Sequence, residues 1–307
     1  MADVKDLTII GGGPAGLTAA LYAARARLST LVLEQGLPGG QMATTDEVAN
    51  YPGFPDAVSG AELSDLMRRQ AEEFGAELEL SEVERVAQEG DEFVLATTGG
   101  ERRSRTVIIA SGATHRKLGV PGEDHLQGRG VSYCATCDGA FFRDQHVFVV
   151  GGGDTAVQEG TFLTRFASRV TVIHRRDQLR ATKVLQEKAF ANPKVDFVWD
   201  SVVEEVLGDQ VVNGVRVRNV KTGETRALPG EGVFVFVGIL PNTTFLHGFV
   251  DLDASGYVVT DAELRTSRPG VFAAGDVRAT PLRQVATAVG DGAMAAVLAE
   301  HWLEERS

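Results

Sequence analysis

The sequence predicts an α/β protein built from two similar domains, and three observations lead to this prediction. The chain has 307 residues, which is more than one average domain needs and enough for two hydrophobic cores. A glycine-rich segment behind an apolar strand occurs twice, and each copy begins the same succession of strand, turn, helix and strand. Glycine contributes 35 residues, about 11% of the chain against an ordinary ~7%, so several sharp turns or close backbone approaches are expected.

The first copy lies near the N-terminus. Leu7–Ile10 is an apolar run typical of a buried strand, and the glycine-rich turn Gly11–Gly16 follows it. A helix is predicted next, and a second apolar strand, Leu31–Glu34, comes after the helix. The apolar positions that recur at helical spacing are Leu17, Ala20, Leu21 and Ala24.

The second copy repeats this pattern 140 residues later. His146–Ala156 aligns with Asp6–Gly16, and the register continues without a gap, so that Thr171–His174 falls opposite Leu31–Glu34. The apolar positions of its predicted helix are Phe162, Leu163 and Phe166. Each copy is therefore a βαβ unit with the Gly-x-Gly-x-x-Gly/Ala turn of a Rossmann-like dinucleotide-binding domain.

The residue types of this turn follow from its function. The first glycine permits the tight turn, the second lets the backbone approach a pyrophosphate, and the small third residue allows helix and strand to pack closely. The phosphates then lie at a helix N-terminus, where free N–H groups and the positive end of the helix dipole favour an anion. One such turn also arises for packing reasons alone, but two in register favour two bound dinucleotides.

The residues at the end of the second strand of each copy distinguish the two dinucleotides. Glu34 would accept hydrogen bonds from a ribose, which suits FAD or NAD. The second copy has His174-Arg175-Arg176, with Arg180 close behind, and arginine matches the geometry of a 2′-phosphate. The alternative is a solvated basic strand end. The alignment with Glu34 favours FAD in the first domain and NADPH in the second.

The two cysteines of the chain form the motif Cys134-Ala-Thr-Cys137, just before the second copy. On a helical turn the two side chains share one face, and a small adjustment brings them to disulfide distance. Half of a zinc site, a pair of inert buried cysteines and a static disulfide are the alternatives. Asp138 follows directly and could transfer the proton that thiol chemistry requires, or could interact with backbone N–H groups at a helix start.

Charge and hydropathy exclude several classes of partner. The formal net charge is −12, which disfavours nucleic acid. Acidic residues stand where a signal peptide has basic ones, and the longest uncharged stretch, Gly232–Val250, is interrupted by Pro241 and by polar residues. No membrane partner is therefore expected, and a cytoplasmic location is predicted.

With these motifs in place, nearly the whole chain resembles the bacterial-type, low-molecular-weight thioredoxin reductases. The resemblance implies class II of the pyridine nucleotide-disulfide oxidoreductases, with two three-layer ββα domains. A discontinuous FAD-binding domain, residues 1–114 and 245–307, would hold an inserted NADPH-binding domain, residues 115–244, that carries the cysteine pair. The matching segments are Gly11–Gly16, Gly39–Gln41, Asn50–Phe54, Ile109–Gly112, Cys134–Gly139, Gly151–Ala156, His174–Arg176 with Arg180, Gly238–Asn242, Ala273–Val277 and Arg283–Gln284.

The same resemblance implies cofactor contacts on both domains. Asp276 has a rationale of its own, because it follows the apolar strand Val271–Ala273 and ligands gather at the carboxyl ends of strands. The residues expected at FAD are Gly11, Gly13, Pro14, Ala15, Gly16, Glu34, Gln35, Gly40, Gln41, Asn50, Val83, Ala110, Gly112, Gly275, Asp276, Arg283, Gln284 and Val285. Those expected at NADPH are Gly153, Asp154, Thr155, Ala156, His174, Arg175, Arg176 and Arg180.

The reaction implied is a thioredoxin-disulfide reductase activity in a homodimer. Electrons would pass from NADPH through FAD to Cys137, and Cys134 would attack thioredoxin or a similar small dithiol protein, with Asp138 as the acid/base. Rotation of the NADPH-binding domain is also implied, with Lys117–Gly119 and Gly238–Thr244 as hinge candidates. Asp154 stands where the family often has asparagine, and its charge at a pyrophosphate-binding helix start is expected to weaken binding.

Three other functions share parts of this pattern. The reductase of a peroxide-removing system normally carries an additional N-terminal disulfide domain, whereas Gly11 begins almost at once here. A flavodoxin- or ferredoxin-type reductase has the same fold but lacks the cysteine pair. A non-catalytic redox sensor would use the pair without turnover, so NADPH consumption with thioredoxin distinguishes the enzyme from the sensor.

Overall fold

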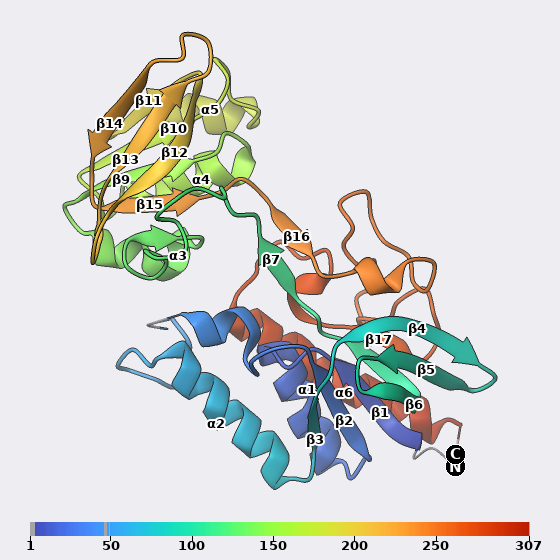
Figure 1. Ribbon diagram of the computed structural model, residues 1–307. Helices are drawn as coiled ribbons and strands as arrows, with labels where there is room; N and C mark the ends of the chain where they lie inside the picture. Colours follow the sequence, from blue (N-terminus) through green and yellow to red (C-terminus); the bar gives the residue numbers. More distant parts are fainter. Residues whose placement is uncertain (1–3, 46–47, 49, 307) are drawn as a thin grey trace. The chain divides into compact units, whose positions relative to one another are not determined.

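The computed structural model describes residues 4–45, 48 and 50–306. The chain divides into two compact units. Unit 1 combines Met1–Thr114 with Leu240–Ser307, and unit 2 consists of His115–Ile239. Figure 1 shows unit 2 in the green-to-orange middle of the chain, while both ends of the chain belong to unit 1. Unit 1 has a mixed sheet with a parallel part and unit 2 has a parallel sheet, which confirms the α/β fold with a repeated Rossmann-like unit.

Unit 1 is built on a seven-stranded sheet of order β3-β2-β1-β6-β5-β4, in which β17 also pairs with β6. The pairs of β1 with β2 and β6, and of β6 with β17, are parallel, so the carboxyl ends of these strands meet at one edge. The elements are β1 (Val4–Ile10), α1 (Pro14–Arg25), β2 (Thr30–Glu34), α2 (Gly60–Glu73), β3 (Glu77–Leu80), β4 (Val83–Glu89), β5 (Glu92–Thr97), β6 (Gly100–Ile109), β17 (Val271–Ala273) and α6 (Val285–Glu304).

Unit 2 repeats the parallel part of this arrangement with the order β11-β10-β9-β15-β8 and adds a separate antiparallel sheet, β12-β13-β14. The elements are β8 (Val131–Ser132), α3 (Ala135–Asp138), β9 (His146–Val150), α4 (Asp154–Leu163), β10 (Arg169–Ile173), α5 (Lys183–Phe190), β11 (Val195–Val198), β12 (Ser201–Gly208), β13 (Val212–Asn219), β14 (Thr225–Pro229) and β15 (Gly232–Val235). Because α4 ends at Leu163, Phe166 lies in the turn after the helix rather than in it, contrary to the predicted pattern.

Small residues on two helices make the core of unit 1 compact. Helices α1 and α6 lie side by side (Figure 1) and bury alanines such as Ala19, Ala23 and Ala295 against Leu7, Ile108 and other strand residues. A Cβ on Gly292 would lie 2.1 Å from the carbonyl oxygen of Ala15, so only glycine permits this close contact of the helices. Within the residues that the structure describes, no helix is long and apolar enough to cross a membrane.

The chain passes between the units at Thr114/His115 and at Ile239/Leu240, within two short strands that pair with each other, β7 (Ala113–His115) and β16 (Ile239–Pro241). The second crossing therefore lies five residues before the predicted boundary at 244/245. Asn242 explains the difference, because its N–H donates to Gly112 O at 3.0 Å and its carbonyl accepts from Ser111 Oγ at 2.7 Å, both in unit 1. The predicted domain ends at residues 1–3 and 307 lie outside the described residues.

Lys117–Gly119, predicted as a hinge, is instead fastened inside unit 2. The N–H groups of Leu118 and Gly119 donate to the two carboxylate oxygens of Glu123 at 2.8 and 2.7 Å, and Lys117 pairs with Asp124 at 2.7 Å. Glu123 is buried, so water does not replace these bonds easily. Lys117–Gly119 therefore belongs to unit 2 by its own hydrogen bonds.

Candidate active site with two nucleotide turns and a redox disulfide

The glycine turn of unit 1 has the geometry that a dinucleotide requires. Gly11 follows β1 with φ of +107°, and its Cβ position lies 2.4 Å from Ala110 O, so no other residue fits. A Cβ on Gly16 would lie 1.8 Å from Gly11 O. A Cβ on Gly13, in contrast, would meet no atom of the described chain within 4 Å. The turn is closed toward the protein and open at the position where a pyrophosphate would approach.

Further predicted FAD residues from distant parts of the sequence converge on this turn. The N–H of Gly39 donates to Gly12 O at 2.7 Å, and a Cβ on Gly40 would lie 3.5 Å from the Cα of Gly13. A Cβ on Gly275, which follows β17, would lie 3.0 Å from the Cβ of Ala15. These segments come together because the strands that precede them are parallel and end at the same edge of the sheet.

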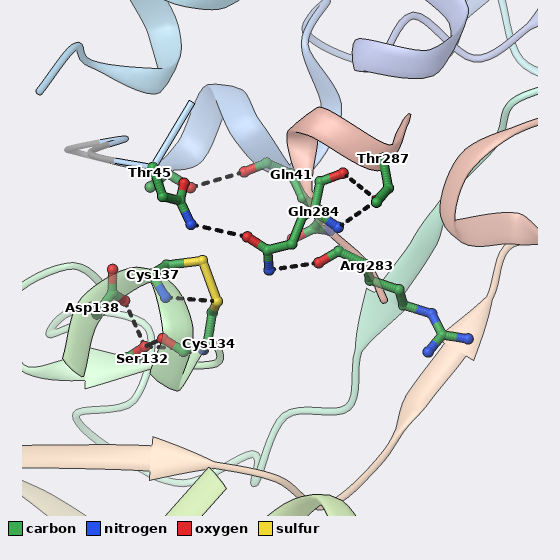
Figure 2. The surroundings of a disulfide bond; sticks show 10 residues. Gln41, Thr45, Ser132, Cys134, Cys137, Asp138, Arg283, Gln284 and Thr287 are labelled. Atoms are coloured by element: carbon green, nitrogen blue, oxygen red, sulfur yellow. Dashed lines mark hydrogen bonds between the residues drawn. A yellow bond between two sulfur atoms is a disulfide. The ribbon is translucent and has the colours of Figure 1, made fainter. Parts of the chain in front are cut away.

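A second group of predicted residues lies where α6 begins. Gln284 is the N-cap residue of α6, and its Oε1 accepts a hydrogen bond from Asn50 Nδ2 at 3.0 Å. Gln284 Nε2 donates to Arg283 O at 2.7 Å (Figure 2). The guanidinium of Arg283 lies over the Tyr257 ring, 4.5 Å from its centre, and its Nε is buried without a partner among the described residues. A buried donor without a protein partner, on the segment that leads into α6, fits a polar cofactor such as FAD.

Not every predicted FAD residue presents its side chain to the turn. Val83 begins β4 and packs its side chain in the apolar core with Ile10, Leu31 and Leu33. Val285 packs against the cluster that contains Met42 and Leu63. Gln35 is exposed after β2, and Gln41 lies in the short 3-10 helix Gly40–Thr44. A role of Val83 in binding adenine would therefore have to come from its backbone.

The two repeats place different side chains next to the middle glycine of the turn, which is Gly12 in unit 1 and Gly152 in unit 2. In unit 1 the carboxylate of Glu34 accepts hydrogen bonds from Gly12 N–H at 2.6 Å and from Gly36 N–H at 2.8 Å, which leaves lone pairs for a ribose. In unit 2 the ring of His174 occupies this place, 2.2 Å from where a Cβ on Gly152 would lie. Burial lowers the pKa of His174 and the nearby arginines lower it further, against a hydrogen bond with the backbone of Gln178 that raises it, so the environment favours the neutral ring. An acid is therefore replaced by a neutral ring among arginines.

The arginines behind β10 are exposed and unpaired. Arg175, Arg176 and Arg180 form no ion pair with any carboxylate in the described part of the chain. The Nη2 atom of Arg180 lies 4.0 Å from the Cβ position of Gly153, next to the glycine turn of unit 2. Three unpaired guanidinium groups beside a dinucleotide turn are suited to a phosphate on the adenosine ribose.

Asp154 has a structural use that the sequence did not suggest. Its Oδ1 accepts a hydrogen bond from Thr182 N–H at 2.6 Å, while Arg180 N–H and Ala181 N–H donate to Gly152 O at 2.7 and 3.2 Å. These bonds connect the segment that begins at Arg180 to the glycine turn of unit 2. The charge of Asp154 is therefore partly balanced by a backbone dipole instead of facing the pyrophosphate position alone.

The cysteine pair lies at the carboxyl end of β8, which is parallel to β15 and so ends at the same edge of the sheet as the glycine turn of unit 2. Cys134 and Cys137 form a disulfide with their Cα atoms 5.3 Å apart (Figure 2). Cys134 is the N-cap residue of α3, and its sulfur accepts a hydrogen bond from Cys137 N–H at 3.1 Å. That donor would favour a thiolate on Cys134 when the disulfide opens.

The family follows from the whole pattern of two nucleotide turns and a disulfide. The family model of the pyridine nucleotide-disulphide oxidoreductases matches residues 5–292. The chain belongs to this family. It is 54% identical over 306 residues to a thioredoxin reductase of Streptomyces coelicolor, covering 99% of this chain and 95% of the relative. It is 52% identical over 304 residues to one of Listeria monocytogenes, covering 98% and 95%.

A solved structure supports the same conclusion. The crystal structure of thioredoxin reductase from Streptococcus pyogenes has a TM-score of 0.96 and 52% identity, and the match covers 99% of this chain and 100% of that chain. These comparisons confirm the predicted family, fold and enzyme class, a flavoprotein oxidoreductase with FAD and NADPH as cofactors. The disulfide expected of this pyridine nucleotide-disulphide oxidoreductase is present as Cys134–Cys137.

Three side chains were missed at the sequence level, the buried Glu123 and Ser132 and the partly buried Asp291, because no local pattern shows which partners they bond. Asp291 on α6 accepts from Gly275 N–H at 3.0 Å and pairs with Arg278 Nε at 2.7 Å, so it supports the Gly275–Asp276 turn. Glu123 also accepts from the hydroxyl of Tyr133, the residue before Cys134, at 2.8 Å. Ser132 donates to Asp138. No motif marks these residues, and only their burial and partners identify them.

Replacing the second glycine of each turn tests the two cofactor positions. Gly13→Ala is expected to change the free energy of unfolding by less than about 1 kcal/mol, because Gly13 has ordinary extended backbone (φ −76°) and an empty Cβ position. Bound FAD per chain, measured by absorbance after dialysis, should fall at least ~10-fold because the methyl group blocks the pyrophosphate. Gly153→Ala should instead weaken NADPH binding and leave FAD bound. Full retention of FAD by Gly13→Ala would contradict the placement.

Gly16→Ala is the matched control for the turn of unit 1. Its Cβ would lie 1.8 Å from Gly11 O, so it should destabilise the protein itself by several kcal/mol. A loss of flavin with loss of fold is thereby distinguished from a loss of flavin with the fold intact.

The carboxyl of Asp276 is expected to make the free energy of unfolding depend on pH. Burial raises the pKa of this carboxyl from 3.8 to about 6, with Asp291 adding to the rise and Arg283 opposing it. Because the native pKa exceeds the unfolded one, the native state keeps a proton that the unfolded state has lost between about pH 4 and pH 6. Stability should therefore fall by about 3 kcal/mol as the pH rises through this window and stay level above it.

Urea unfolding of flavin-free protein between pH 4 and pH 7, with Asp276→Asn as the control, checks this expectation. The variant lacks the titrating carboxyl and should lose the fall in stability across the window. Parallel curves for the two proteins would show that another group is responsible.

Proposed function

We propose that the chain reduces the disulfide of thioredoxin, or of a similar small dithiol protein, with electrons from NADPH. The sequence-based prediction of a thioredoxin-disulfide reductase is confirmed at the level of the family and of relatives that bear this name. The observation that carries the assignment is the Cys134–Cys137 disulfide at the same edge of the unit 2 sheet as the nucleotide turn. A ferredoxin-type reductase would have no use for such a pair.

The chemistry divides between the cofactors and the chain. FAD, when bound, accepts a hydride from NADPH and supplies an electron pair. In the assignment we favour, the pair enters at the sulfur of Cys137, the S–S bond breaks, and Cys134 leaves as the thiolate. The hydrogen bond from Cys137 N–H to Cys134 Sγ supports this direction, because it stabilises charge on Cys134.

Thiol–disulfide exchange completes the turnover. The thiolate of Cys134 attacks the partner's disulfide, forms a mixed disulfide and expels one partner thiolate. Cys137 then attacks the sulfur of Cys134, which restores the Cys134–Cys137 disulfide and releases the second partner thiolate. Asp138, whose N–H donates to Cys134 O at 3.1 Å, lies within the same turn and serves as the acid/base. One NADPH and one proton are consumed for each partner disulfide reduced.

Two further proposals concern the state of the protein in the cell. A homodimer is supported by apolar side chains exposed on α1 and α6, namely Tyr22, Met294 and Val297, which lie on helices rather than in loops. A cytoplasmic location is supported by the use of both cysteines of the chain in the redox pair, which leaves none for a structural disulfide. Sedimentation velocity of the flavin-loaded protein tests the first proposal.

An anaerobic titration tests the function itself. NADPH should bleach the flavin absorbance of the purified yellow protein, and oxidised thioredoxin should then restore the colour with one disulfide reduced per NADPH consumed. NADH at the same concentration is the control for the nucleotide. A protein whose flavin is reduced but is not reoxidised by any dithiol protein would contradict the proposed activity.

A further inference from the structure

The hydroxyl of Ser132 bonds both ends of the segment Cys134–Asp138, which carries the disulfide and is called the redox turn below. Its Oγ is 2.5 Å from Asp138 Oδ2, and it accepts a hydrogen bond from Cys134 N–H at 3.1 Å (Figure 2). The carbonyl oxygen of Cys134 is a longer alternative acceptor at 3.3 Å. The single hydroxyl proton therefore goes to the carboxylate, because charge-assisted bonds are shorter and stronger. A continuous chain runs from the Cys134 amide through Ser132 to Asp138.

The position of this hydroxyl is fixed by the sheet. Ser132 is the last residue of β8, it pairs with Phe234 on the parallel strand β15, and its exposed fraction is 4%. Phe234 is itself fully buried, so the pairing holds Ser132 against the core of unit 2. A carboxylate bonded to this hydroxyl is held by a strand rather than by a loop, which gives the more accurate placement.

The redox turn needs such an anchor because it changes its covalent structure in each turnover. α3 has only four residues, which is too short to be stable by itself. In the oxidised state the disulfide closes the turn. When it opens, the restraints that stay include the backbone bond from Asp138 N–H to Cys134 O and the chain through Ser132, which has no sulfur in it.

We propose that Ser132 is a positioning residue for thiol–disulfide exchange, which holds the carboxylate of Asp138 beside the sulfurs while the disulfide is open. Ser132 does not touch a reacting atom, and it acts only through Asp138. The inference deepens the proposed function and rests on the role of Asp138 as acid/base given there.

Single-turnover kinetics of the flavin-loaded enzyme separates this role from a structural one. Ser132→Ala should leave flavin reduction by NADPH within about 2-fold of wild type and leave the thioredoxin KM unchanged. Reoxidation of the reduced enzyme by thioredoxin should slow by about 10- to 100-fold, the scale of a misplaced acid/base. Ser132→Thr retains the hydroxyl and should recover most of the rate.

A double-mutant cycle decides whether Ser132 acts through Asp138. Ser132→Ala combined with Asp138→Asn should be no slower than Asp138→Asn alone, because residues that act as a unit are not additive. Ser104→Ala is the matched control, since Ser104 is a buried strand serine of unit 1 whose hydroxyl bonds Lys5 O and Thr106 O, both backbone carbonyls. It should have normal kinetics, and its unfolding midpoint shows what loss of a buried hydroxyl costs.

The outcomes distinguish this inference from the function on which it rests. A slow Asp138→Asn with a fast Ser132→Ala, or with multiplicative losses in the double variant, overturns the inference and leaves the acid/base role intact. An Asp138→Asn variant at the wild-type rate removes the acid/base role, and the role of Ser132 with it. Ser132→Ala could also slow the reaction by destabilising the protein, which a lower unfolding midpoint than that of Ser104→Ala would show. In that case Ser132→Thr, which keeps the hydroxyl, must still be reoxidised by thioredoxin at close to the wild-type rate, and a slow Ser132→Thr overturns the inference.

Discussion

Cys134→Ser is expected to keep its flavin, to accept electrons from NADPH, and to lose thioredoxin reduction by about 10⁴-fold or more, the scale seen when a covalent nucleophile is removed. The residues that line the nucleotide turns are untouched by this change, so the yellow colour and its bleaching by NADPH should persist. The measurement is flavin absorbance in stopped flow, followed by steady-state NADPH consumption with thioredoxin. Normal turnover would show that Cys134 is not the attacking thiol.

Cys137→Ser is the matched control, because it also removes the disulfide but leaves the proposed nucleophile. Cys134 should then attack oxidised thioredoxin and remain in the mixed disulfide, since no second thiol releases it. Non-reducing electrophoresis should show this covalent complex with Cys137→Ser and not with Cys134→Ser. The opposite result would exchange the roles of the two cysteines.

The features that sequence could predict are those written in local patterns. Both glycine turns, both second strands and the Val271–Ala273 strand before Asp276 occur where predicted, because turn chemistry and apolar runs are local. The alignment of Glu34 with His174 also holds in space, since each side chain lies beneath the middle glycine of its turn. Aligning the two copies of the repeat therefore located the side chain next to the glycine turn in both nucleotide sites.

The features that sequence could not predict depend on which side chains the fold buries and which partners it brings to them. Asn242 belongs to unit 1 because Ser111 and Gly112 happen to lie beside it, and the boundary moves accordingly. Glu123 is one acidic residue among 42 Asp and Glu, and its burial against Leu118, Gly119 and Tyr133 has no local signature. The same holds for Ser132, whose partner Asp138 was recognised while the serine was not.

The preference for NADPH over NADH should depend on the arginines behind β10. Replacing Arg175 and Arg176 together with alanine is expected to lower kcat/KM for NADPH by at least about 10²-fold, because each charge-assisted hydrogen bond to a phosphate contributes about 1.5–3 kcal/mol. The value for NADH should change by less than about 3-fold, since NADH lacks the 2′-phosphate. Initial rates with both nucleotides at fixed thioredoxin measure the ratio.

A control for charge alone is available on the same unit. Arg216 and Arg218 on β13 are paired with Glu205 and Glu204. Replacing these two arginines with alanine also removes two positive charges from unit 2, but from its separate antiparallel sheet and not from the nucleotide turn. If long-range attraction of the anionic cofactor explained the preference, both double variants would lose NADPH activity alike and in a salt-dependent way. If the unpaired guanidinium groups bind the 2′-phosphate directly, only the variant at Arg175 and Arg176 loses the distinction between the two nucleotides. Equal losses for NADPH and NADH in that variant would contradict the assignment, because a residue that does not contact the 2′-phosphate has no means of telling the two apart.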